Sequence, residues 1–183
     1  MKTPLFLTLL GRAAYWCTGY KCHLKPNVFL GEVIIMKIVE QTEPEAPHVV
    51  RIKWIDGMRF VATDSMGHSI VMDSTKKGGG EGSGFSPLQL LLAALGGCTG
   101  MDVVDILRKQ RQQVDDVEII VSGERVKDFP RVYSKIHVEY SVKGKDIKEK
   151  AVKRAVQLSE EKYCSVGAML RAKAEVTSNY SIQ

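Results

Sequence analysis

The sequence contains few cysteines, and this scarcity excludes a secreted scaffold held together by disulfides. Only four cysteines occur among the 183 residues: Cys17, Cys22, Cys98 and Cys164. Small disulfide-stapled domains are much denser in cysteine. We therefore expect a reducing, cytoplasmic location, where a cysteine acts as a small buried hydrophobe, a metal ligand or a redox group.

Long apolar runs and a dominant charge of one sign are also absent. No stretch reaches the roughly 18 consecutive apolar residues of a membrane span, so we expect no membrane partner. The formal net charge is +5, and most of the excess lies in residues 1–35, where basic residues outnumber acidic ones. Because the remainder is nearly balanced, we expect no nucleic-acid partner.

Sequence motifs for cofactors, metals and hydrolytic triads are missing as well. The sequence has neither the G-x-G-x-x-G nor the G-K-[ST] phosphate-binding pattern, and no serine stands in G-x-S-x-G. The histidines show no paired ligand spacing; they are His23, His48, His68 and His137. Cys17, Cys22 and His23 form C-x4-C-H without a second ligand pair. We therefore expect no cofactor and no metal.

Residues 1–35 differ in character from the rest of the chain. Lys2 precedes a short apolar run that Arg12 ends, and no small-x-small cleavage site follows, so a signal peptide is a poor match. We predict that Met36 is the natural start, that residues 1–35 are an upstream extension, and that residues 36–183 form one domain, a size that suits a single core. A poorly ordered genuine N-terminus is the alternative.

Alternating apolar and polar residues predict a meander of short antiparallel strands near the start of the domain. The predicted strands cover residues 50–54, 59–63 and 68–72, with turns at Asp56-Gly57 and Met66-Gly67. Glycine in each pair suits a hairpin turn. Residues 76–84, KKGGGEGSG, then read as a flexible loop.

A long helix is predicted to begin at Ser86-Pro87, because serine is a good N-cap and proline suits the first helical position. Residues 88–95 are apolar on nearly every side, which predicts a helix buried all round. Gly96, Gly97 and Gly100 interrupt it, and each costs ~1 kcal/mol relative to alanine. We expect the close approach of another backbone, or a kink in the helix, to offset this cost, and the glycines in a buried helix favour packing against the same helix of a second copy.

The remaining segments complete an α+β pattern. Two strands, a second helix and a final strand are predicted at residues 117–121, 132–142, 147–163 and 172–182. The order is therefore three strands, helix, two strands, helix, strand. We see no internal repeat and no linker between domains.

Two cysteines lie in contrasting settings. Cys98 follows two glycines in the first helix, whereas Cys164 ends the second helix ahead of Gly167. Packed, unreactive thiols are one interpretation, since free cysteine is often buried. The other is a peroxide cycle, in which one thiolate becomes a sulfenic acid and a second thiol condenses with it to a disulfide. A nearby cation would lower the pKa of the attacking thiol.

Two segments resemble motifs of the family of osmotically inducible protein C and organic hydroperoxide resistance proteins (OsmC/Ohr). The central-helix signature is matched by SPLQLLLAALGGCTGMDVVDIL, and the second-cysteine motif by LSEEKYCSVGAML. The segment WIDGMRFVATDSMGHSIVMD is similar to the start of that fold, so the resemblance covers about residues 48–183. It implies an intertwined α+β homodimer, with antiparallel sheets around a buried central helix and active sites at the interface.

The resemblance also implies a chemistry, namely reduction of organic or inorganic hydroperoxides in the response to oxidative stress. By motif position, Cys98 is the expected peroxidatic cysteine and Cys164 the expected resolving cysteine. A dithiol reductant, lipoyl-linked in the organic hydroperoxide branch, would restore the pair. The alternative is an OsmC-like dimer that binds a small apolar or electrophilic ligand without efficient turnover.

The sequence departs from the organic hydroperoxide branch where the central helix begins. That branch carries a glutamate directly after the proline, whereas Leu88 and Gln89 stand there in this sequence. The carboxylate that would orient an activating arginine is therefore missing. The resemblance implies such an arginine on an early strand, with Arg59 the first candidate and Arg51 the second. The departure favours the OsmC-like branch over the hydroperoxide resistance branch.

Overall fold

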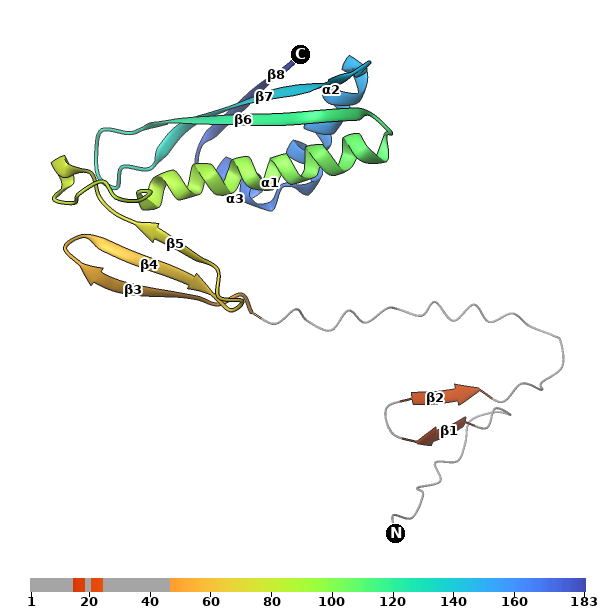
Figure 1. Ribbon diagram of the computed structural model, residues 1–183, viewed down its shortest axis with the longest axis horizontal. Helices are drawn as coiled ribbons and strands as arrows, with labels where there is room; N and C mark the ends of the chain where they lie inside the picture. Colours follow the sequence, from red (N-terminus) through yellow and green to blue (C-terminus); the bar gives the residue numbers. More distant parts are fainter. Residues whose placement is uncertain (1–14, 19–20, 25–46) are drawn as a thin grey trace, which may run out of the picture. The chain divides into compact units, whose positions relative to one another are not determined.

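The computed structural model describes residues 15–18, 21–24 and 47–183 of the chain (Figure 1). The chain divides into two units, residues 1–46 and 47–183. In the first, strands β1 (Tyr15–Thr18) and β2 (Lys21–Leu24) form an antiparallel pair that sets Cys17 opposite Cys22. The predicted start at Met36 lies outside the described residues, so the division into residues 1–35 and 36–183 stays a prediction.

The second unit begins with the predicted meander. Strands β3 (Val50–Asp56), β4 (Arg59–Asp64) and β5 (Ser69–Met72) form an antiparallel sheet in the order β3-β4-β5. Directly opposed residues share a face, and two cross-strand rows are apolar: Trp54, Phe60 and Met72, then Ile52, Ala62 and Ile70. Within the single chain this face stays largely exposed, with Trp54 at 60% and Ile52 at 53%.

The loop predicted to be flexible is folded around a carboxylate. Asp73 is buried and accepts bonds from the backbone N–H groups of Ser74, Glu81 and Ser83 at 2.7, 3.1 and 3.0 Å, and from the Ser83 hydroxyl at 2.9 Å. These bonds, the Ser83 N–H first, lower the pKa of Asp73 to about 2 against the cost of burial. The sequence pattern did not predict this ordered loop. Its glycines indicate only where the chain is able to turn, whereas the conformation depends on the bonds to Asp73.

We expect Asp73→Ala to loosen this loop. Three backbone donors would lose their acceptor, so trypsin should cleave after Lys76 or Lys77 at least several-fold faster than in the wild type. Because folding lowers the pKa of Asp73, its contribution is present above the ordinary value of 3.8 and is lost as the pH falls toward about 2. Asp64→Ala, which removes the acceptor of a neighbouring turn, is the control. Equal cleavage rates in the two variants would contradict this account.

Helix α1 (Pro87–Lys109) starts where the sequence predicts. Ser86 is the N-cap, and its hydroxyl accepts from the Gln89 N–H at 3.3 Å while the Gln89 side chain accepts from the Ser86 N–H at 2.9 Å. This reciprocal capping box satisfies two donors that a helix start otherwise leaves free. Gln89, at the place of departure from the family pattern, therefore has a structural role.

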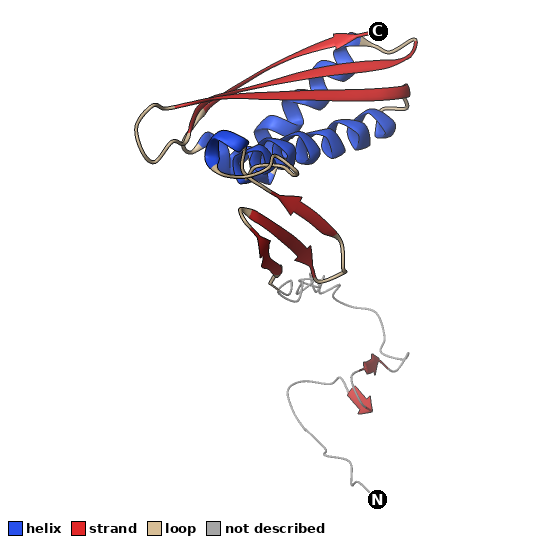
Figure 2. Cartoon of the chain, turned by 60° about the vertical axis from the view of Figure 1, so that its left-hand side comes forward, coloured by secondary structure: helices blue, strands red, loops and turns tan. Residues whose placement is uncertain are grey.

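The helices lie on one face of a second sheet (Figure 2). Strands β6 (Gln113–Arg125) and β7 (Tyr133–Lys145) are antiparallel, and β8 (Glu175–Ile182) adds to β7. β8 runs parallel to β7, so this sheet is mixed and not purely antiparallel as expected. The reason is the connection through α2 (Glu149–Leu158) and α3 (Ser165–Arg171), since parallel neighbours require a crossover.

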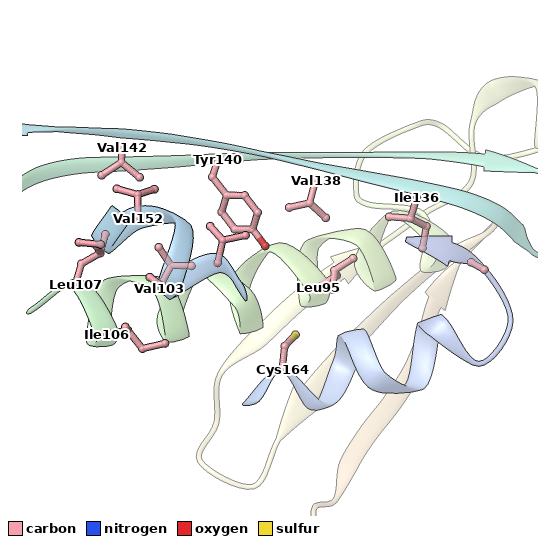
Figure 3. Close-up of a cluster of buried hydrophobic side chains, with 14 of the residues drawn as sticks. Leu95, Val103, Ile106, Leu107, Ile136, Val138, Tyr140, Val142, Val152 and Cys164 are labelled. Carbon is pink, nitrogen blue, oxygen red and sulfur yellow. The ribbon is translucent and has the colours of Figure 1, made fainter. Parts of the chain in front are cut away.

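The core fills the space between this sheet and the helices (Figure 3). Val103 and Leu107 of α1 are fully buried, as are Val142 of β7 and Val152 of α2. Burying such a side chain contributes about 1.5–3 kcal/mol. The α+β fold class is confirmed.

The first half of α1 is not buried all round in the single chain, so that prediction is wrong for one protomer. Leu91 is 42% exposed and Met101 further along is 76% exposed. By length and composition alone α1 is apolar enough to cross a membrane, and 28% of its most apolar window is buried within the chain. It packs against β6, α2 and α3, which makes it a core helix with one uncovered side.

Two of the three glycines in α1 are explained by packing against β6 within the same chain. A Cβ on Gly96 would lie 3.1 Å from the Val121 side chain, and one on Gly100 would lie 2.7 Å from that of Ile119. These two glycines let β6 approach the helix closely. Only Gly97, where a Cβ would meet nothing within 4 Å, is left free for contact with a second copy.

Candidate functional site

Cys98 and Cys164, the two cysteines of the sequence motifs, lie close together in the folded chain. Cys98 projects from α1, and Cys164 precedes α3 as its N-cap. Their sulfurs and a carboxylate oxygen of Asp102 all lie within 4.8 Å of one another. Residues 66 positions apart in the chain are thus brought into one cluster, although both thiols are free.

Helix periodicity explains why Cys98 faces the cluster. Gly96 and Gly100 are four residues apart and share the face that packs on β6. Cys98, midway between them, projects from the opposite side of the helix. Asp102, one turn after Cys98, lies on the same side and joins the cluster.

Cys164 is placed by a break in helical geometry. After α2 the chain forms a π-helical turn, η2 (Ser159–Tyr163), and the Cys164 N–H bonds to the Ser159 carbonyl at 2.9 Å. Single π turns often occur at functional sites. The Cys164 sulfur then accepts from the Gly167 N–H at 3.2 Å. The second helix, predicted at residues 147–163, is therefore α2 followed by this π-helical turn. Helix α3, which begins after Cys164, was not predicted.

Close packing holds Cys164 beside a cation. A Cβ on Gly167 would lie 3.2 Å from the Cys164 sulfur and 3.1 Å from the guanidinium of Arg171. Glycine at this position leaves room for both the sulfur and the guanidinium. Arg171 also donates to the Glu160 carbonyl in the π-helical turn, so it ties α3 back to that turn.

A buried chain of hydroxyls leads from the core to Asp102. Tyr140 and Thr99 are bonded at 2.6 Å, Thr99 and Ser159 at 2.8 Å, and the Ser159 hydroxyl donates to Asp102 at 2.8 Å. Figure 3 shows Tyr140 reaching from β7 toward α1. No buried side-chain nitrogen or oxygen within the described part of the chain lacks a partner. This polar network fixes the carboxylate at the edge of the cluster.

The electrostatics of the cluster keep Cys164 protonated. Burial is the largest cause, and together with the hydrogen bond that the Cys164 thiol donates to Cys98 and the charge of Asp102 it raises the pKa of Cys164 to about 11, against the Gly167 N–H, which lowers it. Burial likewise raises the pKa of Tyr140 to about 12. At neutral pH the Cys164 sulfur is therefore a thiol and Tyr140 a hydroxyl donor.

The proposed activating arginine has another partner in the single chain. Arg59 follows the β3–β4 turn and binds Asp56 through two bonds of 2.6 and 2.5 Å. Arg51, the second candidate, is exposed on β3. Sequence reasoning missed Arg171, Asp102 and the hydroxyl network. The spacing of Asp102 four residues after Cys98 was the one signal that could have found it.

An apolar groove lies along α1 and β6. It holds about 500 Å³. Its lining residues are Phe85, Gln89, Leu92, Ala93, Gly96, Gly97, Val117, Ile119 and Val121. Gly96 and Gly97 have no side chains to fill this space. The lack of a side chain at Gly96 also lets β6 approach the helix closely.

Comparison with known proteins decides the family. Residues 80–179, which include both cysteines, match the model of the OsmC-like protein family. The chain belongs to the OsmC-like family. This confirms the resemblance drawn from the two cysteine motifs.

Individual OsmC-like relatives agree with that assignment. Protein YhfA of Escherichia coli strain K12 is 42% identical over 132 residues, which are 72% of this chain and 96% of YhfA. A crystallised protein of Aquifex aeolicus VF5 is 34% identical, with a TM-score of 0.64 over 75% of this chain and 98% of that one. An organic hydroperoxide resistance protein OsmC from Legionella pneumophila shares the fold, with a TM-score of 0.58 at 15% identity over 76% and 99% of the two chains.

Proposed function

We propose that this OsmC-like protein reduces hydroperoxides with Cys98 and Cys164 as a redox pair. The proximity of the two sulfurs, within 4.8 Å, carries the proposal. A disulfide needs two sulfurs about 2.05 Å apart, so a local shift of a few ångströms would join them. The similarity in fold to hydroperoxide resistance proteins gives further support.

The roles within the pair follow from access and protonation. Cys164 is only 4% exposed, and with a pKa of about 11 it is protonated at neutral pH. Cys98 is half-buried and so more accessible to a peroxide. Because the thiolate is the nucleophile, we assign the first attack to Cys98 and resolution to Cys164. Arg171 is the cation of the same chain that lies beside the cluster.

The proposed cycle has three steps, in which atoms and electrons balance. The Cys98 thiolate attacks the peroxide oxygen, the O–O bond breaks, and the alcohol leaves with one proton as Cys98 becomes a sulfenic acid. The Cys164 thiol then displaces water and forms the Cys98–Cys164 disulfide. A dithiol, of the lipoyl type, reduces that disulfide and becomes a disulfide itself. A reducing, cytoplasmic location would supply such a dithiol.

Arg59 remains a proposed activating residue, acting from a second protomer. In its own chain it is bound to Asp56 in an exposed turn, so it would have to exchange that partner for the site. The missing carboxylate at Leu88 means that no acid at the helix start would orient it. We therefore expect slower turnover than in enzymes that have that acid.

Peroxide consumption tests the proposal directly. The variant with Cys17→Ser and Cys22→Ser should consume cumene hydroperoxide when dihydrolipoamide is present, with one dithiol oxidised per peroxide. This background leaves Cys98 and Cys164 as the protein's thiols. Peroxide loss no faster than in protein-free buffer would refute the proposed function.

We also propose that the protein is a homodimer. The apolar face of the β3–β5 sheet and the uncovered side of α1 are both exposed in one chain, and contiguous apolar surface of this kind marks interaction sites. A second copy of the chain would cover them. Such a dimer would also account for the predicted burial of α1.

Ile52→Asp is expected to raise the dimer dissociation constant at least about tenfold, or about 1.4 kcal/mol, because it sets a charge in the apolar face. Lys53→Asp is the matched control, since the next residue on a strand points to the opposite face. Sedimentation equilibrium of both variants measures the effect. A monomeric wild type, or equal weakening in both variants, would contradict this dimer.

A second candidate function is the binding of a small apolar ligand without turnover. The groove along α1 and β6, with its volume of about 500 Å³, favours it because ligand sites are concave and mostly apolar. Native mass spectrometry of protein purified from cells would find the ligand retained. A Leu92→Trp variant should release it while leaving both thiols in place.

A further inference from the structure

We propose that Cys98, Cys164 and Asp102 form a binding site for a thiophilic divalent cation of the Zn²⁺ class. The inference goes beyond hydroperoxide reduction, because it concerns a different ligand of the same sulfurs. It departs from our expectation of no metal, which rested on spacing along the chain. The three donors come from α1 and from the start of α3, and only the fold brings them together.

The geometry fits a tetrahedral ion with little rearrangement. All three donor atoms lie within 4.8 Å of one another. With Zn–S bonds of about 2.3 Å, two sulfurs on a tetrahedral ion are about 3.8 Å apart. The two sulfurs therefore have to close by at most about 1 Å, and each sulfur–oxygen pair by at most about 1.3 Å because the Zn–O bond is shorter. The fourth position would be left for water or an added ligand.

The donor set also has the outer support that metal sites need. Carboxylates that bind metals are themselves held by hydrogen bonds. The Ser159 hydroxyl donates to Asp102 at 2.8 Å, and Ser159 is in turn bonded to Thr99 at 2.8 Å. Ser159 and Thr99 are 0% and 2% exposed, so the carboxylate is oriented by groups that cannot move freely.

The charges favour a cation over two isolated thiolates. The Asp102 carboxylate adds a negative donor beside the two sulfurs, and this strengthens the attraction for a divalent ion. On binding, the two thiols would release their protons to solvent. The three negative donors, the ion and the Arg171 guanidinium beside Cys164 then sum to neutrality. A bound ion would cover both sulfurs and block the peroxide cycle.

Cobalt titration provides the test, because Co²⁺ reports thiolate bonding through its charge-transfer absorption. Anaerobic, fully reduced protein with Cys17→Ser and Cys22→Ser is titrated, so that Cys98 and Cys164 are the remaining thiols. We expect one Co²⁺ per chain, an intense thiolate charge-transfer band and the visible bands of a tetrahedral ion. The absence of that charge-transfer band would overturn the proposal.

Paired substitutions on α1 separate ligation from general charge. Asp102→Asn should weaken Co²⁺ binding at least about tenfold. Asp105→Asn should leave it unchanged, because Asp105 is exposed and bonded to Lys109 at 2.6 Å. Equal effects of the two variants would overturn the assignment of Asp102.

Alkylation of Cys98 tests the same proposal without any substitution in the site, so its result does not depend on whether a variant folds. One equivalent of Zn²⁺ should slow the alkylation of Cys98 by N-ethylmaleimide at least about tenfold, with the modified residue identified by mass spectrometry. Unchanged alkylation overturns the proposal. Metal-free protein that reduces peroxide but does not bind Co²⁺ would sink this inference alone, whereas protein that binds Co²⁺ but does not reduce peroxide would sink only the proposed function.

Discussion

Cys98→Ser is expected to lower the rate of hydroperoxide reduction by at least about a thousandfold, in line with the loss of an essential nucleophile. A serine hydroxyl is not ionised at neutral pH, and Cys164 cannot replace Cys98. Cys164 is only 4% exposed, and the pKa of its thiol is about 11. The measurement is peroxide consumption with excess dithiol, in a background lacking Cys17 and Cys22.

Cys164→Ser in the same background separates the two roles. It should retain the first reaction with peroxide and accumulate a sulfenic acid on Cys98, which dimedone would label once per chain. The background protein with both site cysteines is the control and should give little labelling. Full steady-state activity in Cys98→Ser, or dimedone labelling of Cys164 in place of Cys98, would contradict the assigned roles.

Thr99→Val is expected to lower the free energy of unfolding by about 2–4 kcal/mol, because it leaves two buried hydroxyls short of a partner. Thr99 bonds Tyr140 at 2.6 Å and Ser159 at 2.8 Å, and all three residues are at most 2% exposed. Valine has a similar shape, so the loss reflects the hydrogen bonds and not a cavity. The midpoint of thermal unfolding should fall by about 10 °C.

Thr63→Val is the matched control for that experiment. Its hydroxyl bonds Ser69 at 2.9 Å on the exposed meander, where water replaces a lost partner, so we expect a change of at most about 0.5 kcal/mol. Tyr140→Phe should cost less than Thr99→Val, because it removes one hydroxyl and leaves one partner short. Equal stability of the Thr99 and Thr63 variants would show that the buried network does not stabilise the fold.

Local patterns in the sequence were enough to predict most of the fold. Alternation predicted the meander, and Ser86-Pro87 predicted the start of α1, because strand period and helix capping act over a few residues. The two cysteine motifs predicted the family, which the match over residues 80–179 confirms, whereas the redox pairing of Cys98 with Cys164 stays a prediction. The proximity of Cys98 and Cys164 supports that pairing.

The parts that were missed depend on contacts distant in sequence. The loop after β5 follows Asp73, whose partners lie up to ten residues away, and nothing in the glycine pattern indicates which acid they surround. The hydroxyl network joins α1, β7 and η2, so no single segment reveals it. The family resemblance implies an activating arginine on an early strand, such as Arg59, whereas the folded chain brings Arg171 near Gly167 and Cys164.

The most direct test of the redox pair is peptide mapping after one equivalent of cumene hydroperoxide is added to reduced protein. We predict that the main product contains a disulfide between the Cys98 and Cys164 peptides, formed within one chain, with both thiols consumed together. If Cys98 instead accumulates as sulfinic acid while Cys164 stays a free thiol, the two sulfurs do not act as a pair and the proposed cycle is wrong.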